Sequence, residues 1–153
     1  MLRKEKSSKP AGINRASLSL FSDFFNDFEK SLDKRKKLAL LLQEELGQLG
    51  FEVQESQDNV FCYVSALVPK AISGKRNEIV QRLKKHKVFC TRIWHTPIIL
   101  NKEAQKEYQI NLDEFPNTLE AAERIINFPL QGYYTEKDVR KIITALKKVM
   151  SNL

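Results

Sequence analysis

The sequence predicts an α+β fold in which a small antiparallel sheet is covered by helices and preceded by a long helix. Three observations predict it: apolar residues at three- and four-residue steps near the N-terminus, β-branched and aromatic runs bounded by turn residues in the middle, and a return of the helical spacing at the end. A chain of 153 residues with 42% hydrophobic content is long enough to bury one core.

The chain divides into a basic lead-in, residues 1–13, and one domain, residues 14–153. The lead-in contains Pro10 and Gly12 and shows no periodicity, so we expect it to be flexible. Residues 1–15 hold five basic groups and one acidic group of a chain whose net charge is +7. Because most of the excess charge lies in a solvated tail, the charge distribution argues against nucleic-acid binding.

A long helix is predicted from Leu18 onward. Helix-forming residues fill positions 34–46, and Gly47 and Gly50 provide the end. The spacing allows one helix or two abutting ones. The apolar residues form a stripe along one side of the helix, and we expect most of this stripe to pack in the core of the domain and part of its aromatic surface to meet a partner. The apolar positions are Leu18, Phe21, Phe25, Phe28, Leu32, Ala39, Leu42, Leu46 and Leu49, widened by Leu20 and Phe24.

A β-β-α-β unit is predicted next. Residues 51–54 and 59–68 are strand candidates joined by a turn at 56–59, so they predict an antiparallel hairpin. A helix over residues 75–85 follows, and residues 88–94 read as a third strand.

The C-terminal part is predicted to be mostly helical. Residues 101–113 are polar enough to form a loop or a short helix. Asn117 and Glu120 then predict a capping box at the start of a short helix, and residues 126–130 predict a brief extended segment.

The final helix has the clearest pattern. Thr135 and Asp138 form a cap-like pair before it, and Lys147 and Lys148 suit its C-terminal dipole. Its predicted apolar face consists of Val139, Ile142, Ile143, Leu146 and Val149.

Several classes of site have little support. No Gly-x-Gly arrangement suggests a phosphate-binding loop, and Cys62, Cys90, His86 and His95 have no metal-ligand spacing. We expect both cysteines to be buried free thiols. No apolar run approaches the roughly 20 residues of a membrane span, and no signal-peptide pattern is present, so we expect a cytoplasmic protein.

The segment Thr91-Arg92-Ile93-Trp94-His95-Thr96-Pro97 is the candidate binding site. It places an arginine, the only tryptophan and a histidine at a predicted strand end, where loops carry polar groups toward ligands. In the functional interpretation Arg92 or His95 contacts an anionic or hydroxyl-rich substrate. In the alternative, Trp94 fills the core and His95 is a surface turn residue.

Four stretches carry a family resemblance over about residues 12–150. The first is Gly12-Ile13-Asn14-Arg15 with the long helix after it, and the second is the β-β-α-β unit that leads to Trp94-His95-x-Pro97. The third is residues 115–124, and the fourth runs from Ile125-Ile126-Asn127-Phe128-Pro129-Leu130 to Tyr134-Thr135-Glu136-Lys137-Asp138-Val139. The last is similar to a Leu-Ser-Leu-Pro-Leu and Thr-x-x-Asp signature. Together they resemble the C-terminal small domain of the DegT/DnrJ family of sugar aminotransferases, which are fold-type-I enzymes dependent on pyridoxal phosphate (PLP).

The resemblance implies a small domain that closes over the active-site mouth of a homodimer. Asn14 matches the family's asparagine that reaches the cofactor phosphate of the neighbouring subunit, and Arg92, Trp94 and His95 become substrate-binding candidates. The sequence departs from the family by lacking one residue between Asn14 and Arg15.

PLP catalysis also requires a Schiff-base lysine and an acidic partner, which the family carries in a large domain. The resemblance therefore implies a chain that is not catalytically competent alone and that works with a large PLP-binding domain in cis or in trans. Two alternatives stay open. One is a freestanding protein-interaction module that is derived from the same fold, has lost the chemistry and binds a protein through Phe21, Phe24, Phe25 and Phe28. The other is an RNA-binding domain that uses the tail and residues 84–87.

Overall fold

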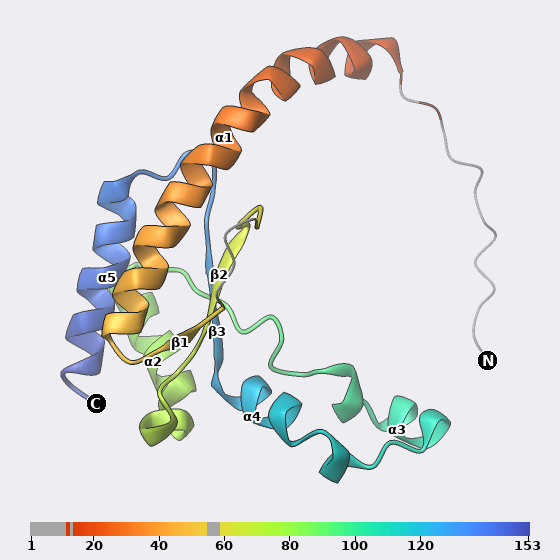
Figure 1. Ribbon diagram of the computed structural model, residues 1–153, viewed down its shortest axis with the longest axis vertical. Helices are drawn as coiled ribbons and strands as arrows, with labels where there is room; N and C mark the ends of the chain where they lie inside the picture. The colour runs from red at the N-terminus through yellow and green to blue at the C-terminus, as the bar shows by residue number, and fades with distance from the viewer. Residues whose placement is uncertain (1–11, 13, 55–58) are drawn as a thin grey trace.

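The computed structural model describes residues 12, 14–54 and 59–153. The predicted flexible lead-in and the predicted turn at 56–59 lie almost wholly outside these residues. The fold is α+β, as predicted: a small antiparallel sheet lies against helices, and a long helix leads into it (Figure 1). Among the described helices, none has the length and hydrophobicity that crossing a membrane requires.

The sheet consists of three strands in the order β1 (Glu52–Val53), β2 (Tyr63–Leu67) and β3 (Ile125–Pro129). Both neighbouring pairs are antiparallel, so the predicted hairpin of β1 and β2 is confirmed. The segment predicted to be briefly extended near the C-terminus is the third strand of this sheet.

Residues 88–94 do not form the predicted strand. Thr91 alone bridges to β3, opposite Asn127, with backbone N···O distances of 2.9 and 2.8 Å. The chain enters this segment from α2 (Arg76–Lys85) through Lys87, whose φ is 59°, and it turns away again directly after Thr91. Only Thr91 is therefore placed to pair with the backbone of β3, and one paired residue is too short to form a strand.

The predicted long helix is confirmed as one element, α1 (Arg15–Gln48), which at 34 residues is about 51 Å long. Its C-terminal half packs on the body and buries Leu38, Ala39, Leu42 and Leu46. The apolar residues from Leu18 to Phe28 are exposed, so the expectation that most of the stripe packs in the core is wrong for this half. The physical reason is length, because α1 extends beyond the elements that it packs against (Figure 1).

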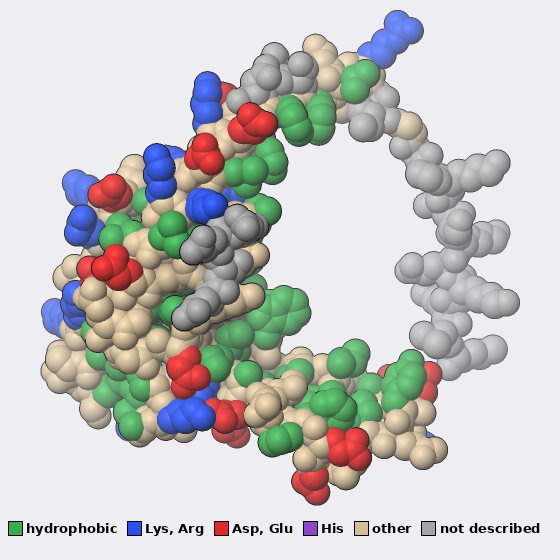
Figure 2. Space-filling view, viewed as in Figure 1, with side chains coloured by type: hydrophobic (Ala, Val, Ile, Leu, Met, Phe, Trp, Pro, Cys, Tyr) green, Lys and Arg blue, Asp and Glu red, His purple; other side chains and the backbone are tan. Residues whose placement is uncertain are grey.

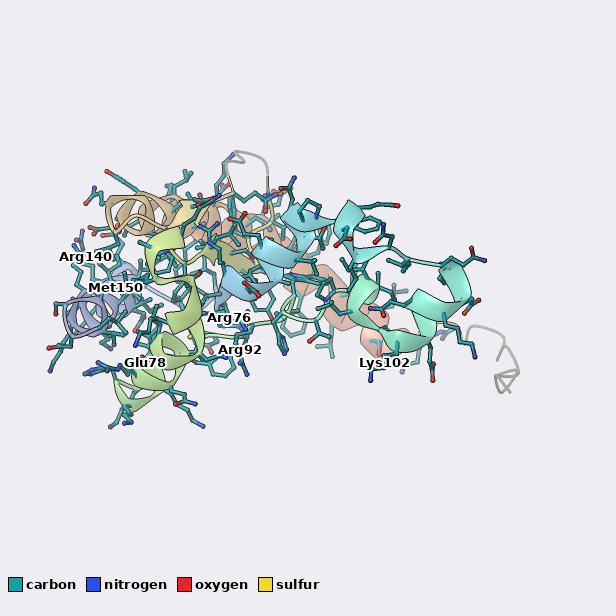
Figure 3. All side chains as sticks on the ribbon, turned by 90° about the horizontal axis from the view of Figure 1, so that it is seen from below. Arg76, Glu78, Arg92, Lys102, Arg140 and Met150 are labelled. Carbon is teal, nitrogen blue, oxygen red and sulfur yellow. The ribbon has the colours of Figure 1, made fainter. Side chains whose placement is uncertain are left out.

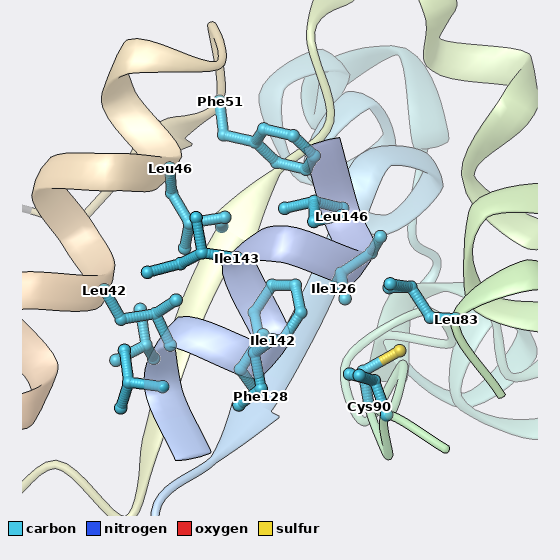
Figure 4. Close-up of a cluster of buried hydrophobic side chains, with 14 of the residues drawn as sticks. Leu42, Leu46, Phe51, Leu83, Cys90, Ile126, Phe128, Ile142, Ile143 and Leu146 are labelled. Atoms are coloured by element: carbon cyan, nitrogen blue, oxygen red, sulfur yellow. The ribbon is translucent and has the colours of Figure 1, made fainter. Parts of the chain in front are cut away.

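The core lies where α1, α2 and α5 (Glu136–Met150) meet the sheet (Figure 4). The predicted capping box of α5 is present: the backbone N–H of Thr135 donates to Asp138 Oδ2 at 3.0 Å. All five predicted apolar positions of this helix are buried. Other core side chains include Leu42, Leu46, Leu83, Ile126 and Phe128.

Two helices, α3 (Lys102–Tyr108) and α4 (Pro116–Arg124), form an arm that projects from the sheet (Figure 1). Helix α3 lies in the segment predicted to be a loop or a short helix. The predicted capping box at Asn117 is wrong, because α4 begins at Pro116, and its N-cap residue Phe115 makes no side-chain cap bond. Proline suits the first helical position, since its φ is preset and it has no N–H to satisfy. Short 3₁₀ turns complete the chain: η1 (Lys70–Lys75), η2 (Ile98–Leu100) and η3 (Leu112–Glu114).

Arg124 ties the arm to the sheet. Its side chain is buried, its Nε donates to the Val68 carbonyl at 2.8 Å, and its guanidinium forms ion pairs with Glu52 and Glu120. A buried cation needs such partners, because an unpaired charge in the interior costs several kcal/mol.

The prediction that both cysteines are buried is confirmed for Cys90 and wrong for Cys62. Cys90 is buried, and burial raises the pKa of its thiol to about 11. Cys62 is exposed, so the expectation that it is buried is wrong. Phe61 has a φ of 48° and is buried, which breaks the strand alternation just before β2 and leaves Cys62 in solvent.

Candidate functional site

The candidate segment, residues 91–97, forms an exposed turn beside β3. The His95 N–H donates to the Arg92 carbonyl at 3.0 Å, which closes a four-residue turn, and His95 Nδ1 contacts the same carbonyl. Trp94 is 64% exposed and does not fill the core. Arg92, Trp94 and His95 are therefore brought together on one surface turn.

Asn127 fastens this turn to the sheet. Its side chain is fully buried in the middle of β3; Oδ1 accepts from the Ile93 N–H at 2.9 Å, and Nδ2 donates to Ser65 Oγ at 2.8 Å. Since the Asn127 backbone also pairs with Thr91, the first half of the turn rests on a rigid base.

Arg92 lies beside a second arginine, Arg76, at the start of α2 (Figure 3). Arg92 Nη1 donates to Asn77 Oδ1 at 2.6 Å, and Arg76 Nε donates to the same oxygen at 3.3 Å. The pKa of Arg76 is lowered mainly by burial and then by the positive charge of Arg92, whereas Glu123 raises it. Two neighbouring guanidinium groups make this place suitable for an anionic group.

Asn14 directly precedes α1, whose N-terminal end projects away from the sheet and the other helices (Figure 1). It is the N-cap of the helix: its Oδ1 accepts from the Ser17 N–H at 2.8 Å. The side-chain NH₂ group remains as its donor, next to the positive end of the helix dipole. The structure does not bring Asn14 and the turn into one site within this chain.

The exposed half of α1 carries a continuous apolar surface, which we call the aromatic face. The phenylalanine rings stack along it, with centroid distances of 5.7 Å between Phe21 and Phe25 and 6.0 Å between Phe25 and Phe28. With Phe24 they line a shallow apolar hollow of about 320 Å³. The face consists of Leu18, Leu20, Phe21, Phe24, Phe25 and Phe28, each 44–73% exposed.

The aromatic face borders an open concavity between α1 and the arm that carries α3. Figure 2 shows hydrophobic side chains on the inner side of α1 and, across the concavity, on the arm. Ile98, Tyr108 and Phe115 are the large exposed apolar residues of the arm segment. Such a surface on two separate elements is typical of an interface, because soluble monomers rarely expose large apolar patches.

Sequence reasoning missed Arg76, Asn77 and Asn127. Asn127 had a visible signal, as it is the single polar residue in the apolar run from Ile125 to Leu130. Arg76 and Asn77 had none, because only the fold brings the start of α2 to the turn at Arg92.

The described residues do not fit the whole of a PLP site. A Schiff-base lysine must be shielded from water, and none of the lysines that the structure describes is buried. Among the same residues, no cluster of histidine, cysteine or carboxylate side chains could hold a metal ion. We therefore assign no catalytic step to this part of the chain.

Comparison with known proteins agrees with the family resemblance that the sequence motifs indicate. The model of the DegT/DnrJ/EryC1/StrS aminotransferase family matches residues 17–147. Two solved structures of a protein named as a sugar aminotransferase, Spr1654 from Streptococcus pneumoniae, in apo and PMP forms, are similar to 90% of this chain with 20% identity and a TM-score of 0.75. NtdA from Bacillus subtilis with bound cofactor PMP is similar to 77% of it, with 21% identity and a TM-score of 0.65.

These structures are longer than this chain. The similar region covers 34% of the Streptococcus pneumoniae protein and 28% of the Bacillus subtilis protein, so the chain spans about a third of their length. No curated protein sequence matches the chain.

Proposed function

Because the chain belongs to the DegT/DnrJ/EryC1/StrS aminotransferase family, we propose that it is the small domain of a PLP-dependent sugar aminotransferase. Residues 14–153 form this domain, and residues 1–13 are its lead-in. The domain works with a large PLP-binding domain, either in the same polypeptide or in a separate one. Alone it is not catalytically competent, because the large domain provides the Schiff-base lysine.

The observation that carries the proposal is the exposed aromatic face of α1. Six large apolar side chains on one helix face are left without cover, while the similar solved structures contain about twice as much further chain. We place the large domain in the concavity, where it covers the aromatic face and the apolar side chains of the arm. Burying this surface stabilises the assembly by roughly 25 cal/mol per Å².

The turn and Asn14 then serve two different active sites of a homodimer. Arg92, together with Arg76, binds an anionic group of the substrate, while Trp94 and His95 contact its sugar part at the mouth of the site. The NH₂ group of Asn14 donates to the PLP phosphate in the neighbouring subunit, which accounts for its distance from the turn. The PLP itself supplies the electron sink for amino-group transfer. The assembled enzyme is cytoplasmic.

The freestanding interaction module is the less favoured use of the same aromatic face. A module derived from the same fold accounts for the exposed phenylalanines and for the family match over residues 17–147, but it supposes a loss of the family's chemistry that the aminotransferase proposal does not need.

An immunoblot of source-cell lysate with an antibody against this domain separates the two arrangements of the enzyme. A band clearly larger than 17.8 kDa places both domains in one polypeptide. A band at 17.8 kDa means that the large domain is a separate chain, if the antibody also co-precipitates it, or that the chain is a freestanding module, if it does not.

The domain contact is tested in the assembled enzyme with the double substitution Phe24→Ser and Phe25→Ser. We expect loss of PLP binding, measured by the visible absorption of the bound cofactor, because the large domain loses its apolar contact. Leu40→Ser is the matched control: Leu40 is exposed on the same helix, in the half that packs on the body. Equal PLP binding by the double variant and the control would refute the proposed docking.

The roles of Arg92 in substrate binding and of Asn14 in PLP binding are tested by two different measurements. Arg92→Ala is expected to raise KM for an anionic sugar substrate and to leave PLP absorption unchanged. Asn14→Ala is expected to weaken PLP binding itself. An Arg92→Ala enzyme with unchanged KM would remove the turn from the substrate site.

A further inference from the structure

A basic groove lies between the C-terminal end of α2 and the exposed face of α5, and the proposed aminotransferase role does not use it. Its volume is about 720 Å³. Five cationic side chains line it, and none of the described carboxylates does: the cations are Lys87, Lys137, Arg140, Lys141 and Lys148.

The positive charge of the groove is largely uncompensated. Arg140 lies 3.7 Å from Glu136, and Lys141 lies 3.4 Å from Asp138, but both pairs are exposed and therefore weak. Lys87, Lys137 and Lys148 form no ion pair with a described residue. The opposite side of α5 differs, since Lys147 is paired with Glu45 at 2.8 Å.

The cations on α5 form a row. Lys137, Lys141 and Lys148 follow steps of four and seven residues, so they lie on one side of the helix. Eleven residues of helix between the first and the last span about 16 Å. At roughly 3.4 Å per phosphate along a stacked strand, this row matches about four or five nucleotides, which is longer than the phosphates of a single nucleotide.

An aromatic hollow continues the groove at one end. It has a volume of about 250 Å³, shares Lys87 and Lys141 with the groove, and is also lined by Phe89, Tyr133 and Tyr134. Asp138 is the one carboxylate in this lining, and it is paired with Lys141 at 3.4 Å. Phe89 is 68% exposed and Tyr133 is 77% exposed. Exposed rings beside a basic track are the surface on which unpaired bases stack.

We propose that the basic groove binds single-stranded nucleic acid, with phosphates along the cations of α5 and a base stacked on Phe89 or Tyr133. A rigid duplex presents its bases to each other and leaves the rings without a stacking partner, so a single strand suits the groove better. The groove shares Lys87 with the RNA surface considered from sequence, but its row of cations comes from α5. The distribution of charge along the sequence argued against nucleic-acid binding because it does not show that the fold gathers these cations on one side of a helix.

The test measures fluorescence anisotropy of a labelled oligouridylate of about twelve nucleotides with the full chain. We expect binding that weakens with salt, with a slope of log K against log salt near −2 for about three phosphate contacts at about 0.7 each. The double variant Lys137→Glu and Lys148→Glu should bind at least about tenfold more weakly, with a slope shallower by about 1.4.

The matched control is Lys102→Glu with Lys106→Glu. Both residues are exposed on α3, and Lys102 lies at the opposite end of the molecule from Arg140 (Figure 3). This variant has the same net charge as the groove variant and should keep nearly full affinity. Circular dichroism checks that each variant is folded.

A third variant, Phe89→Ala, tests stacking and should weaken binding by about fivefold or more. Inorganic polyphosphate serves as a competitor without bases. The proposal is overturned if the chain does not bind the oligouridylate at low salt, or if the control and groove variants lose equal affinity. It is also overturned if Phe89→Ala binds like the wild type and polyphosphate competes as well as unlabelled RNA does. PLP binding by the assembled enzyme is a separate measurement, so failure here leaves the proposed function intact.

Discussion

The side chain of Asn127 and the backbone of Ile93 are joined by a 2.9 Å hydrogen bond that connects the centre of the sheet to the exposed turn. The donor is the Ile93 N–H, and the acceptor is a fully buried amide oxygen. Because Ile93 lies between Arg92 and Trp94, this bond sets the direction in which both side chains leave the surface. A strand residue therefore positions a candidate binding turn that lies 34 residues earlier in the chain.

Asn127→Ala is expected to lower the free energy of unfolding by about 1–3 kcal/mol, because the partly buried Ile93 N–H loses its acceptor. Urea unfolding measures this loss, and trypsin should cleave faster after Arg92 in the freed turn. Asn117→Ala, at an exposed position in α4, is the control and should stay within about 0.5 kcal/mol of the wild type. Equal stability of the two variants would contradict the positioning role of Asn127.

Arg124→Met tests the buried cation. We expect a loss of about 1–3 kcal/mol, because the Val68 carbonyl loses its donor, whereas the partly exposed carboxylates of Glu52 and Glu120 can turn to water. Arg140→Met removes only an exposed ion pair and should cost well under about 1 kcal/mol. The comparison is made by urea unfolding at neutral pH. If both substitutions cost the same, the buried hydrogen bond contributes nothing measurable.

Acid should destabilise the domain through Glu120. Hydrogen bonds from Lys70 and then Arg124 lower the pKa of Glu120 in the folded state. The unfolded state therefore binds more protons, so this stabilisation is present above the ordinary glutamate pKa of about 4.3 and is lost as the pH falls through the lower folded value.

The corresponding variant is Glu120→Gln, which should be less stable than wild type at pH 7 and should show a shallower loss below about pH 4.5. Glu107→Gln on α3 is the control, since Glu107 is exposed and forms no ion pair with a described residue. Unfolding midpoints across the acid range measure the slopes. Parallel curves for wild type and Glu120→Gln would count against the assignment.

Gly132 permits a close approach of the loop before α5 to α1. A Cβ atom at this position would lie 2.7 Å from Ser31 Oγ, and the loop is held there by Lys34 Nζ, which donates to the Gly132 carbonyl at 3.1 Å. Gly132→Ala should cost about 1 kcal/mol, because the Ser31 hydroxyl must rotate away from the new methyl group. The double variant Ser31→Ala and Gly132→Ala should recover most of this loss, and thermal unfolding of the four combinations measures the coupling.

The helices and the hairpin could be predicted because their patterns are local. The three- and four-residue spacing before Gly47 and the Thr135–Asp138 pair each involve neighbours along the chain, and both predictions are confirmed. The capping box at Asn117 failed for an equally local reason, because Pro116 is the better first residue of a helix.

The third strand could not be assigned from its residues. Both 88–94 and 126–130 are β-like runs, and each is long enough to pair with β2. Only the fold decides between them, because pairing depends on where α2 and the arm deliver each segment to the sheet. For the same reason Arg92 was found as a candidate, while its neighbour Arg76 was not.

By itself the sequence determined the fold class, the long first helix, the last helix and the family resemblance, since these follow from the spacing of apolar residues and from short motifs. The tertiary structure decided which apolar residues are covered, leaving the aromatic face of α1 open and burying Asn127. It also brought Lys87 to the cations of α5 to form the basic groove. The reason is physical: helical spacing depends on residues within a few positions, whereas burial and charge clustering depend on contacts between segments that are distant in the chain.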